Sequence, residues 1–390
     1  MTYTFFNLSD NVRHPFYVQG PNMSDQQVYV PTPLEKARQD FVLGIKFLAN
    51  GIAQQRVRDV YRHDVLPQAE RRLGHAPTTR REVERDLART TAFRSWAVLT
   101  HRSQGMMWDA IEATTRRVAP QAVSQLASLR TAPAKRGSLE LDPALEIPTP
   151  ISNTEIHRQP GGFVGSADPD DLVPGLRYIG ASLIYAVGKG QAKAASDGRA
   201  HNLLSQLQAR FPDFRPRRIL DLGCGVGVHS QAIALAFPEA EYHGVDVAAG
   251  LLRFGHLIAE QRGLPIHFHQ RDASRTGFEA ASFDLVLSNI LFHETNSARL
   301  PQILRECRRV LKPGGVMLHA DVATQTSRLE LDDQVMNDWQ VRWNGEPFWT
   351  GYAERDMHKE MIAAGFASEQ CFTEYVTHGK SVGFVFGASV

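Results

Sequence analysis

Apolar residues recur at helical spacing in the first third of the chain. Within residues 34–61, Phe41, Ile45, Leu48 and Ile52 follow one another at steps of four, three and four residues. This spacing places them on one side of a helix and predicts an amphipathic helix. The first third of the chain is therefore expected to be mostly helical.

A second helical pattern begins after Thr78 and Thr79 and runs from about residue 80 to 118. Glycine weakens a helix, and proline cannot donate the backbone hydrogen bond that a helix interior needs. The pattern thus predicts an interruption near Gly105 and an end at Pro120.

The composition changes between Ala132 and Gly175, where Pro, Gly, Ser and Asp are frequent and the apolar residues follow no helical or strand period. Such a composition is typical of a linker or a loop-rich crossing between domains. We therefore divide the chain into a helical domain (1–135), a loop-rich linker (136–175) and a third, larger domain (176–390).

From Leu176 onward, helical segments alternate with short apolar runs bounded by turns, as in a parallel sheet covered by helices on both faces. The expected helices are 177–188, 197–211, 228–237, 248–262 and 297–312, the last ending at "KPGG". The expected strands are 218–222, 241–245, 266–270, 283–288 and 316–321.

Two further apolar runs, "EQCFTEYV" and "SVGFVFGA", are separated only by "THGK". Four residues are too few for a parallel crossover, so these runs predict an antiparallel hairpin. The fold class expected is α/β: a Rossmann-like, seven-stranded, doubly wound sheet with a terminal antiparallel hairpin, preceded by a mostly α-helical N-terminal domain.

The stretch "ILDLGCGVGVHS" (219–230) joins a strand to a helix through glycines at alternate positions. Glycines in such a turn let the backbone approach a ligand closely. If the ligand is anionic, the N-terminus of the following helix also helps to hold it. No Walker sequence is present, and a dinucleotide site usually has its third glycine one position later than Gly227.

In this stretch the sequence resembles the class I S-adenosylmethionine (SAM)-dependent methyltransferases. "LDLGCGVG" is similar to their first motif, "GVDV" supplies their acidic residue, "RDA" their adenine-contacting pair, and "LKPGG" a late signature. The motifs follow in the family's order over about residues 176–390. The resemblance implies a Rossmann-like fold, SAM as cofactor and S-adenosylhomocysteine as its product.

The resemblance also implies a role for individual residues. The loop would wrap the methionine part of SAM, Asp246 would accept both ribose hydroxyls, and Asp272 would accept from the adenine amino group. The complete implied set is Asp221, Gly223, Cys224, Gly225, Gly227, Asp246, Val247, Asp272, Ala273 and Asn289.

Some of these residues also have purely structural interpretations. Asp246 can cap the helix that begins near Ala248, and Asp272 can stabilise a turn. Cys224 occupies a position that favours small residues, and it is read as a packing residue rather than as a nucleophile.

Methyl transfer from a sulfonium needs a positioned nucleophile and, for an amine or hydroxyl acceptor, a group that takes or shares its proton. Neither a metal nor a covalent intermediate is required, and no metal is expected. The candidates for proton handling are His293 and Glu294 in "SNILFHET", after the fourth expected strand. The alternative is that Glu294 begins the next helix and His293 packs beneath it.

Residues expected around the acceptor come from three places. Aromatic residues in "DWQVRWNGEPFWTGY" include Trp349 and Tyr352, and they either enclose an acceptor or form the inner face of a helix. "IHRQPGGFVG" contributes His157, as a lid or a turn. Tyr178 and Tyr185 lie on the helix entering the third domain.

The net charge is +1, but residues 1–136 carry 20 Lys and Arg against 12 Asp and Glu. These basic side chains either bind an anionic partner or lie on solvated helix faces. A third interpretation is that the basic residues 1–136 and the acidic remainder of the chain attract each other when they dock. The three cysteines form no CxxC pair, and no long apolar run or export segment is legible, so a cytoplasmic protein without a membrane span is expected.

The leading functional hypothesis is methyl transfer to a small-molecule acceptor (an N, O or C nucleophile), in specialised metabolism, with the helical domain forming an acceptor pocket or a homodimer interface. The alternatives are another reaction of SAM such as cyclisation or elimination, an RNA or protein methyltransferase, and a SAM-binding regulator. Nucleic acid is not the expected partner, because no RNA-binding module is legible and "SNIL" replaces the Asn/Asp-Pro-Pro-Tyr/Phe motif of many base-amino methyltransferases.

Overall fold

A computed structural model describes residues 28–132, 135–166, 168–188, 195–324, 329–378 and 381–390. The first residues of the chain, on which the expectation about export rests, lie outside this part.

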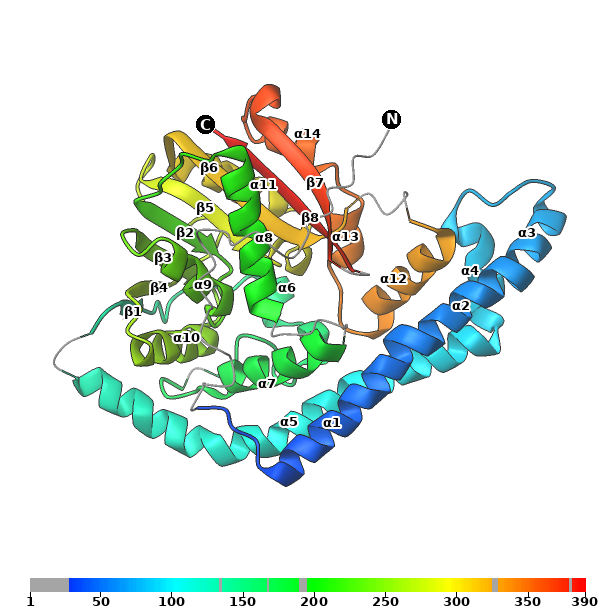
Figure 1. Cartoon of the computed structure of the whole chain (residues 1–390), viewed down its shortest axis with the longest axis horizontal. Helices are drawn as coiled ribbons and strands as arrows, with labels where there is room; N and C mark the ends of the chain where they lie inside the picture. The colour runs from blue at the N-terminus through cyan, green and yellow to red at the C-terminus, as the bar shows by residue number, and fades with distance from the viewer. Residues whose placement is uncertain (1–27, 133–134, 167, 189–194, 325–328, 379–380) are drawn as a thin grey trace.

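The N-terminal part consists of helices that lie along one another (Figure 1). They are α1 (Pro33–Phe47), the π-helical turn η2 (Leu48–Ala53), α2 (Gln54–Val60), a second π-helical turn η3 (Tyr61–Val65), α3 (Leu66–Leu73), α4 (Arg80–Arg89) and α5 (Thr91–Thr131). Thr32 begins α1 with a capping box to Glu35, and Gly74 ends α3 in the left-handed conformation.

Helix α5 corrects two predictions, because it runs through both Gly105 and Pro120. Pro120 lies on the exposed side of the helix, where water can solvate the carbonyl that loses its intrahelical donor. Beyond the proline, Ala122 and Leu126 are 0% and 1% exposed in the core. Burial of this second half outweighs the local cost of the proline. The helical pattern from residue 80 onward is instead interrupted at Thr90, which separates α4 from α5 and caps the start of α5.

The segment predicted to be a loop-rich linker contains short elements. These are β1 (Ser138–Glu140), α6 (Thr149–Ser152), the 3-10 turn η4 (Ile156–Arg158) and the beginning of α7 (Val173–Gly188), which is followed by α8 (Ala195–Arg210). Strand β1 pairs in parallel with β4 and makes the sheet eight-stranded rather than seven-stranded. Gly137 permits this close approach, since a Cβ there would lie 2.0 Å from the carbonyl oxygen of Ile266.

The remaining strands confirm the predicted doubly wound sheet. They are β2 (Arg218–Leu222), β3 (Glu241–Asp246), β4 (Ile266–Gln270), β5 (Phe283–Asn289), β6 (Leu311–Val322), β7 (Cys371–His378) and β8 (Ser381–Ser389). Their order is β1-β4-β3-β2-β5-β6-β8-β7, in which β8 runs antiparallel to both neighbours. Strand β6 begins at Leu311, earlier than expected, because "KPGG" lies within the strand beside a register shift rather than before it.

Helices cover both faces of this sheet. They are α9 (Val228–Ala236), α10 (Ala249–Gln261), the 3-10 turn η5 (Phe292–Glu294), α11 (Leu300–Val310), α12 (Leu331–Trp343), α13 (Trp349–Ala353), α14 (Met357–Ala363) and the 3-10 turn η7 (Ser368–Gln370). Side chains alternate along a strand, so Ile219 packs under α8, α9 and α10 while Leu220 packs under α11 and α14. Both faces of the central strands are therefore buried.

The helical part shares its cores with the rest of the chain. Met107 and Ile111 of α5 pack with Ile179 of α7 and Phe254 of α10, and Val57 of α2 belongs to a cluster with residues of α12. Helix α7 lies between α5 and the sheet (Figure 1).

Ion pairs join the same surfaces. Arg58 pairs with Asp333 at 2.9 Å, and Arg80 with Asp338 at 3.0 Å. Part of the basic excess of the N-terminal residues is thus used within the chain.

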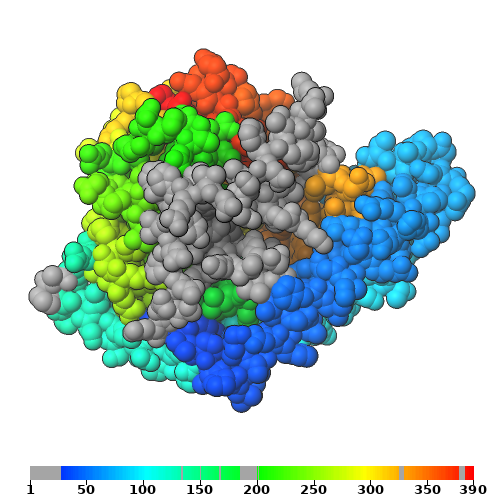
Figure 2. All heavy atoms as spheres, viewed as in Figure 1, coloured from blue at the N-terminus to red at the C-terminus, as the bar shows by residue number. Residues whose placement is uncertain are grey.

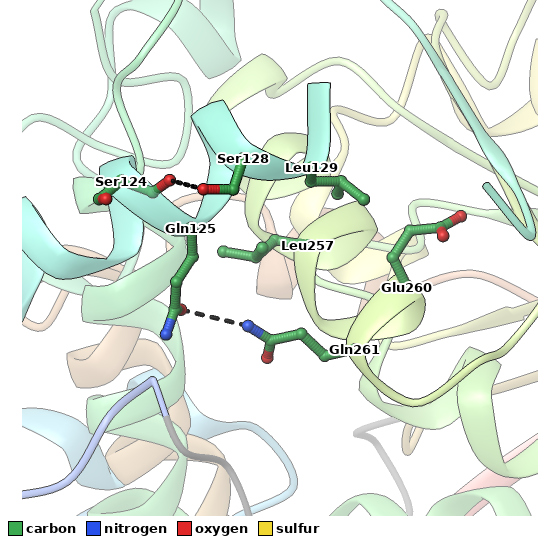
Figure 3. Close-up of a pocket in the computed structure, with 7 residues that line it drawn as sticks. All are labelled: Ser124, Gln125, Ser128, Leu129, Leu257, Glu260 and Gln261. Carbon is green, nitrogen blue, oxygen red and sulfur yellow. Dashed lines mark hydrogen bonds between the residues drawn. The ribbon is translucent and has the colours of Figure 1, made fainter. Parts of the chain in front are cut away.

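A shallow pocket lies where α5 meets α10 (Figure 3). Gln261 donates to the side-chain carbonyl of Gln125 at 3.1 Å, and the Glu260 carboxylate accepts from the backbone N–H groups of Arg136 and Gly137 at 3.0 and 2.6 Å. Glu260 is thus the anchor that holds the chain at the start of β1, and the pocket offers no reactive group.

Among the described residues, no helix has both the length and the apolar character needed to cross a membrane.

Candidate active site

The loop between β2 and α9 folds tightly at the carboxyl edge of the sheet. Gly223, Gly225 and Gly227 all have positive φ values, of 65°, 55° and 67°. Side chains other than glycine are strained in this conformation. A Cβ at Gly225 would meet no atom within 4 Å, so only the backbone conformation requires this glycine in the chain itself. The open space beside Gly225 belongs to a cavity.

The cavity is bounded by the carboxyl ends of the strands on one side and by the segment before α7 on the other. Its apolar lining includes Pro148, Ile151, Ile156, Phe163, Tyr178, Val245, Leu251 and Leu291. Its polar lining includes Gly223, Gly225, Asp246, Asp272, Asn289, His157 and Glu294. An apolar wall with a few convergent polar groups is the usual character of a small-molecule site.

Asp246, at the end of β3, holds the glycine loop in place. Its carboxylate accepts from the backbone N–H of Gly225 at 2.9 Å and from that of Ala248, before α10, at 2.9 Å. Burial raises the pKa of Asp246, although these two backbone donors oppose the shift. A carboxylate has about four acceptor positions, so Asp246 both caps the helix and can accept hydroxyl groups from the cavity.

Asp221 turns away from the cavity. It is 0% exposed and accepts from Ser230 Oγ at 2.5 Å, from Tyr242 Oη at 3.0 Å and from His229 Nε2 at 3.1 Å. These bonds hold the first turn of α9 against the sheet. Asp221 therefore stabilises the glycine loop from the side that faces away from the cavity.

Comparisons with known proteins agree with this geometry. Residues 219–315 match the family described as "Methyltransferase domain". A malonyl-[acyl-carrier protein] O-methyltransferase of Methylococcus capsulatus is 36% identical over 201 residues, which are 50% of this chain and 67% of that protein. The chain belongs to the class I SAM-dependent methyltransferases. The predicted family, enzyme class and cofactor are thereby confirmed.

Other relatives and solved structures are similar to this chain at lower identity. A Bacillus cereus protein named malonyl-[acyl-carrier protein] O-methyltransferase is 28% identical and aligns with 46% of this chain and 67% of its own length. A Synechocystis magnesium protoporphyrin IX methyltransferase with bound S-adenosylhomocysteine has a TM-score of 0.39 at 17% identity, covering 53% of this chain and 85% of the other.

The cavity of this methyltransferase fits SAM. Gly223, Gly225, Asp246, Val247, Asp272, Ala273 and Asn289 line it. Asn289 is the clearest indication, because its buried side-chain oxygen has no hydrogen-bond partner in the described structure. An unpartnered buried acceptor is costly, and a ligand with N–H or O–H groups would satisfy it.

Asp272, in the turn after β4, is also held in position. Its carboxylate accepts from the backbone N–H and the hydroxyl of Ser274 at 2.8 and 2.7 Å, and it pairs with Arg299. Asp272 thus stabilises a turn, as the structural interpretation proposed, and in addition borders the cavity next to Ala273.

The backbone is strained where the cavity meets η5 and η4. Ile290 has a φ of 61° and His157 a φ of 54°, and both residues line the cavity. Positive φ is unfavourable for a β-branched residue and uncommon for any residue other than glycine. Such strain persists only where neighbouring contacts enforce it, and it is frequent at functional sites.

Imidazoles and carboxylates alternate beside this strained backbone. Glu346 Oε1 lies 2.8 Å from His157 Nδ1, and His157 Nε2 lies 2.8 Å from Glu294 Oε1. The same Glu294 oxygen lies 3.2 Å from His293 Nε2, whose Nδ1 lies 2.5 Å from Asp321 Oδ1. We call this row, Glu346–His157–Glu294–His293–Asp321, the relay.

Charge alternates along the relay. Burial disfavours the charged imidazole of His157, but the carboxylates of Glu346 and Glu294 outweigh it and raise the pKa of His157 to about 10. Burial is likewise outweighed at His293, whose pKa is raised by Asp321 and Glu294. Burial would raise the pKa of Glu294, but the two imidazoles lower it instead. These shifts favour an ionised Glu294 carboxylate between two protonated imidazoles.

One oxygen of Glu294 remains available. Glu294 Oε2 is buried and has no hydrogen-bond partner in the described structure, and the residue lines the cavity. The predicted pair of proton-handling residues is therefore divided: Glu294 borders the cavity, while His293, only 4% exposed, lies behind it and does not line it.

His157 is fixed by three parts of the chain. Its backbone N–H donates to the carbonyl of Gly345 at 2.7 Å. Its own carbonyl accepts from Gln104 Nε2 at 2.8 Å and from Trp108 Nε1 at 2.9 Å, both on α5. The long N-terminal helix thus positions a residue that borders the cavity.

Several expected residues lie outside the cavity lining. Cys224 and Gly227 pack behind the loop, against Gly244 and Phe268. Trp349 packs near the ring of His293, at 6.0 Å between ring centroids, and Tyr352 is 1% exposed in the core under α11. Tyr185 lies in α7, and its side chain is outside the described part.

Sequence reasoning missed Glu346, Asp321, Gln104 and Trp108. Asp321 carried a weak signal, since it lies near the carboxyl end of a predicted strand. Glu346 lies within the stretch "DWQVRWNGEPFWTGY", where only the aromatic residues were considered. Gln104 and Trp108 are distant in sequence from every recognised motif, and only the packing of α5 brings them to His157.

His157, Glu294 and Glu346 also have the residue types of a metal site, with one ligand atom of each within 4.8 Å of the others. However, both nitrogens of the His157 ring already face carboxylates, so a metal would have to displace a proton there. The imidazolium supplies the positive charge that balances the two carboxylates.

Proposed function

We propose that this methyltransferase acts on a small molecule whose reacting amine or hydroxyl group donates a hydrogen bond to Glu294 Oε2. The observation that carries the proposal is this unpartnered buried oxygen on a residue that lines the cavity. SAM supplies a methyl group already activated by its sulfonium, so positioning the acceptor is the main task of the protein.

Glu294 suits an acceptor that becomes positively charged. When a neutral amine takes the methyl group, the C–S bond breaks, its electrons stay on sulfur, and the new C–N bond leaves a positive charge on nitrogen. A fixed carboxylate favours that charge. The two imidazole neighbours lower the pKa of the Glu294 carboxyl, so the carboxylate stays ionised and stabilises the methylated ammonium by a hydrogen bond. The ammonium loses its proton to water after release.

The size of the acceptor is limited by the wall opposite the sheet. Ile156, Phe163 and Tyr178 come from η4, the loop after it and α7, and together with His157 they cover the side of the cavity that faces away from the sheet. An apolar wall excludes water from the reacting atoms and favours a compact, partly apolar molecule. This supports a small-molecule acceptor over a folded polymer.

The names of the relatives point to different acceptors. Besides the acyl-carrier-protein enzymes, a Cereibacter sphaeroides protein named ubiquinone biosynthesis O-methyltransferase is 30% identical over 159 residues, which are 40% of this chain and 62% of that protein. The acceptor must therefore be found by experiment.

The test uses the purified chain with SAM and panels of amines, phenols and carboxylic acids, with S-adenosylhomocysteine measured by mass spectrometry. Product should accumulate only with an amine or hydroxyl acceptor. With that acceptor, Glu294→Gln should lower kcat by about 10²- to 10⁴-fold and leave SAM affinity within a few-fold.

The matched control is Glu360→Gln, which removes a carboxylate that is 16% exposed and paired with Arg355 at 2.8 Å, away from the cavity. It should leave kcat unchanged. Methylthioadenosine formed from SAM alone, or full activity of Glu294→Gln, would contradict the proposal.

A further inference from the structure

An exposed apolar face follows α1 into η2. Leu34, Phe41, Leu48 and Ile52 are 63%, 62%, 38% and 72% exposed. The first three are seven residues apart, which places them in one row on the helix. The opposite side is buried, with Val42 and Ala49 packed inside at 3% and 1% exposed. Figure 2 shows the blue helical run from α1 onward at the surface.

Small residues form a second row beside these large ones. Ala37 and Gly44 are also seven residues apart and exposed, and Gly51, in the π-helical turn η2, is exposed beyond them. A Cβ at Gly44 or at Gly51 would meet nothing within 4 Å, so no described contact of this chain requires a glycine at either position. Glycine inside a helix is less favourable than alanine. Two such exposed glycines indicate that another backbone approaches this side.

The two rows are complementary to each other in an antiparallel arrangement. With a two-fold axis passing between residues 42 and 43, Ala37 faces the partner's Leu48, and Phe41 faces the partner's Gly44. Each large side chain then enters the space above a small residue, as knobs enter holes. A parallel pair would instead place Phe41 against Phe41 and leave gaps at the glycines.

We propose that two copies of this chain form a homodimer through this face, with their α1 helices antiparallel. The face, which we call the α1 face, comprises Leu34, Ala37, Phe41, Gly44, Leu48, Gly51 and Ile52. A second copy is favoured over an unrelated helix because a single axis matches Phe41 with Gly44 and Leu48 with Ala37. A two-fold contact of this kind closes on itself and gives a dimer, not a fibre.

The area of the α1 face is that of a weak, reversible dimer. A fully exposed Leu, Ile or Phe side chain presents on the order of 150–200 Å², so the exposed fractions of the four large residues amount to about 350–470 Å² per copy. Two copies bury about 700–950 Å² through these side chains, less than the roughly 1,200 Å² of a stable interface, which is the size of a weak, reversible contact. Dissociation is therefore expected within an accessible concentration range.

The test measures the mass of the full chain by sedimentation velocity from about 1 to 100 µM. The mass should rise from 43.5 kDa toward twice that value. Gly44→Leu should raise the dissociation constant at least 100-fold, because the new side chain occupies the space of the partner's Phe41. The same variant should not melt below the wild-type monomer, because its side chain meets only solvent there.

Two further variants keep the test decisive. Phe41→Arg should also give monomers, while Val98→Arg, at a position of α5 that is 60% exposed outside the α1 face, should leave the dimer intact. None of these residues lines the cavity, so each variant should keep its SAM affinity. A wild-type chain that stays monomeric at 100 µM, or an intact dimer in both Gly44→Leu and Phe41→Arg, would overturn the proposal.

Discussion

Replacing Glu346 by glutamine tests whether His157 is an imidazolium. Burial opposes the charge on His157, but Glu346 and Glu294 raise its pKa from 6.5 to about 10. A group whose pKa is raised on folding stabilises the protein fully below its unfolded pKa, and this stabilisation is lost as pH rises through the folded pKa. The wild-type chain should therefore lose stability between about pH 6.5 and pH 10.

The size of this loss follows from the shift. A difference of about 3.5 pKa units corresponds to at most about 5 kcal/mol, at 1.36 kcal/mol per unit. The ring of His157 is 24% exposed, so screening by water reduces this value and we expect about 2–4 kcal/mol.

Glu346→Gln keeps an oxygen that accepts from His157 Nδ1 but removes the carboxylate whose attraction raises the pKa most. The pKa of His157 should fall by more than about one unit, and the loss of stability between pH 6.5 and 9.5 should shrink by about 1–3 kcal/mol. Histidine carbon NMR measures the pKa, and urea unfolding at the two pH values measures the stability.

The control variant is Glu84→Gln, since Glu84 is 30% exposed and its pair with Arg342 is a surface one, at 3.3 Å. It should leave the pH dependence unchanged. The reasoning is refuted if His157 titrates near 6.5 in the wild-type chain, or if Glu346→Gln has the same pH dependence as the wild type.

Three further results are expected. Asp246→Ala should weaken SAM binding more than about 10-fold by calorimetry, because it removes both the cavity carboxylate and the acceptor for Gly225; near-normal affinity would contradict the site. Pro120→Ala should raise the free energy of unfolding by about 1–3 kcal/mol in urea titrations, since it restores a helical donor on the exposed side of α5; no gain would mean that the helix has already relaxed around the proline. EDTA should leave methyl transfer unchanged, because the His157 imidazolium balances its carboxylates, and activity restored by a divalent ion after chelation would refute this.

The sequence determined the sheet and the cofactor loop because both depend on local patterns. Strands 218–222 and 266–270 have the predicted bounds, and the short spacing before "SVGFVFGA" correctly gave an antiparallel hairpin. Positive φ at alternate glycines is a local demand of the backbone, so "GCGVG" identified the loop before its surroundings were known.

Local patterns misjudged elements whose stability comes from distant contacts. Pro120 does not end α5, because the helix beyond it is buried against the rest of the chain. Strand β1 was not predicted, since three residues have no legible period and pair only because β4 offers a free edge that Gly137 can approach.

The relay likewise depends on tertiary structure. Glu294 and His293 follow a predicted strand, and the sequence named both, but it could not tell which of them borders the cavity. His157 and Glu346 are 189 residues apart, and α5 and the segment after α12 must both be in place before they meet. Charges on groups this distant in sequence are set only when folding removes them from water and brings them within hydrogen-bond distance, and the pKa values of the site are therefore a property of the fold.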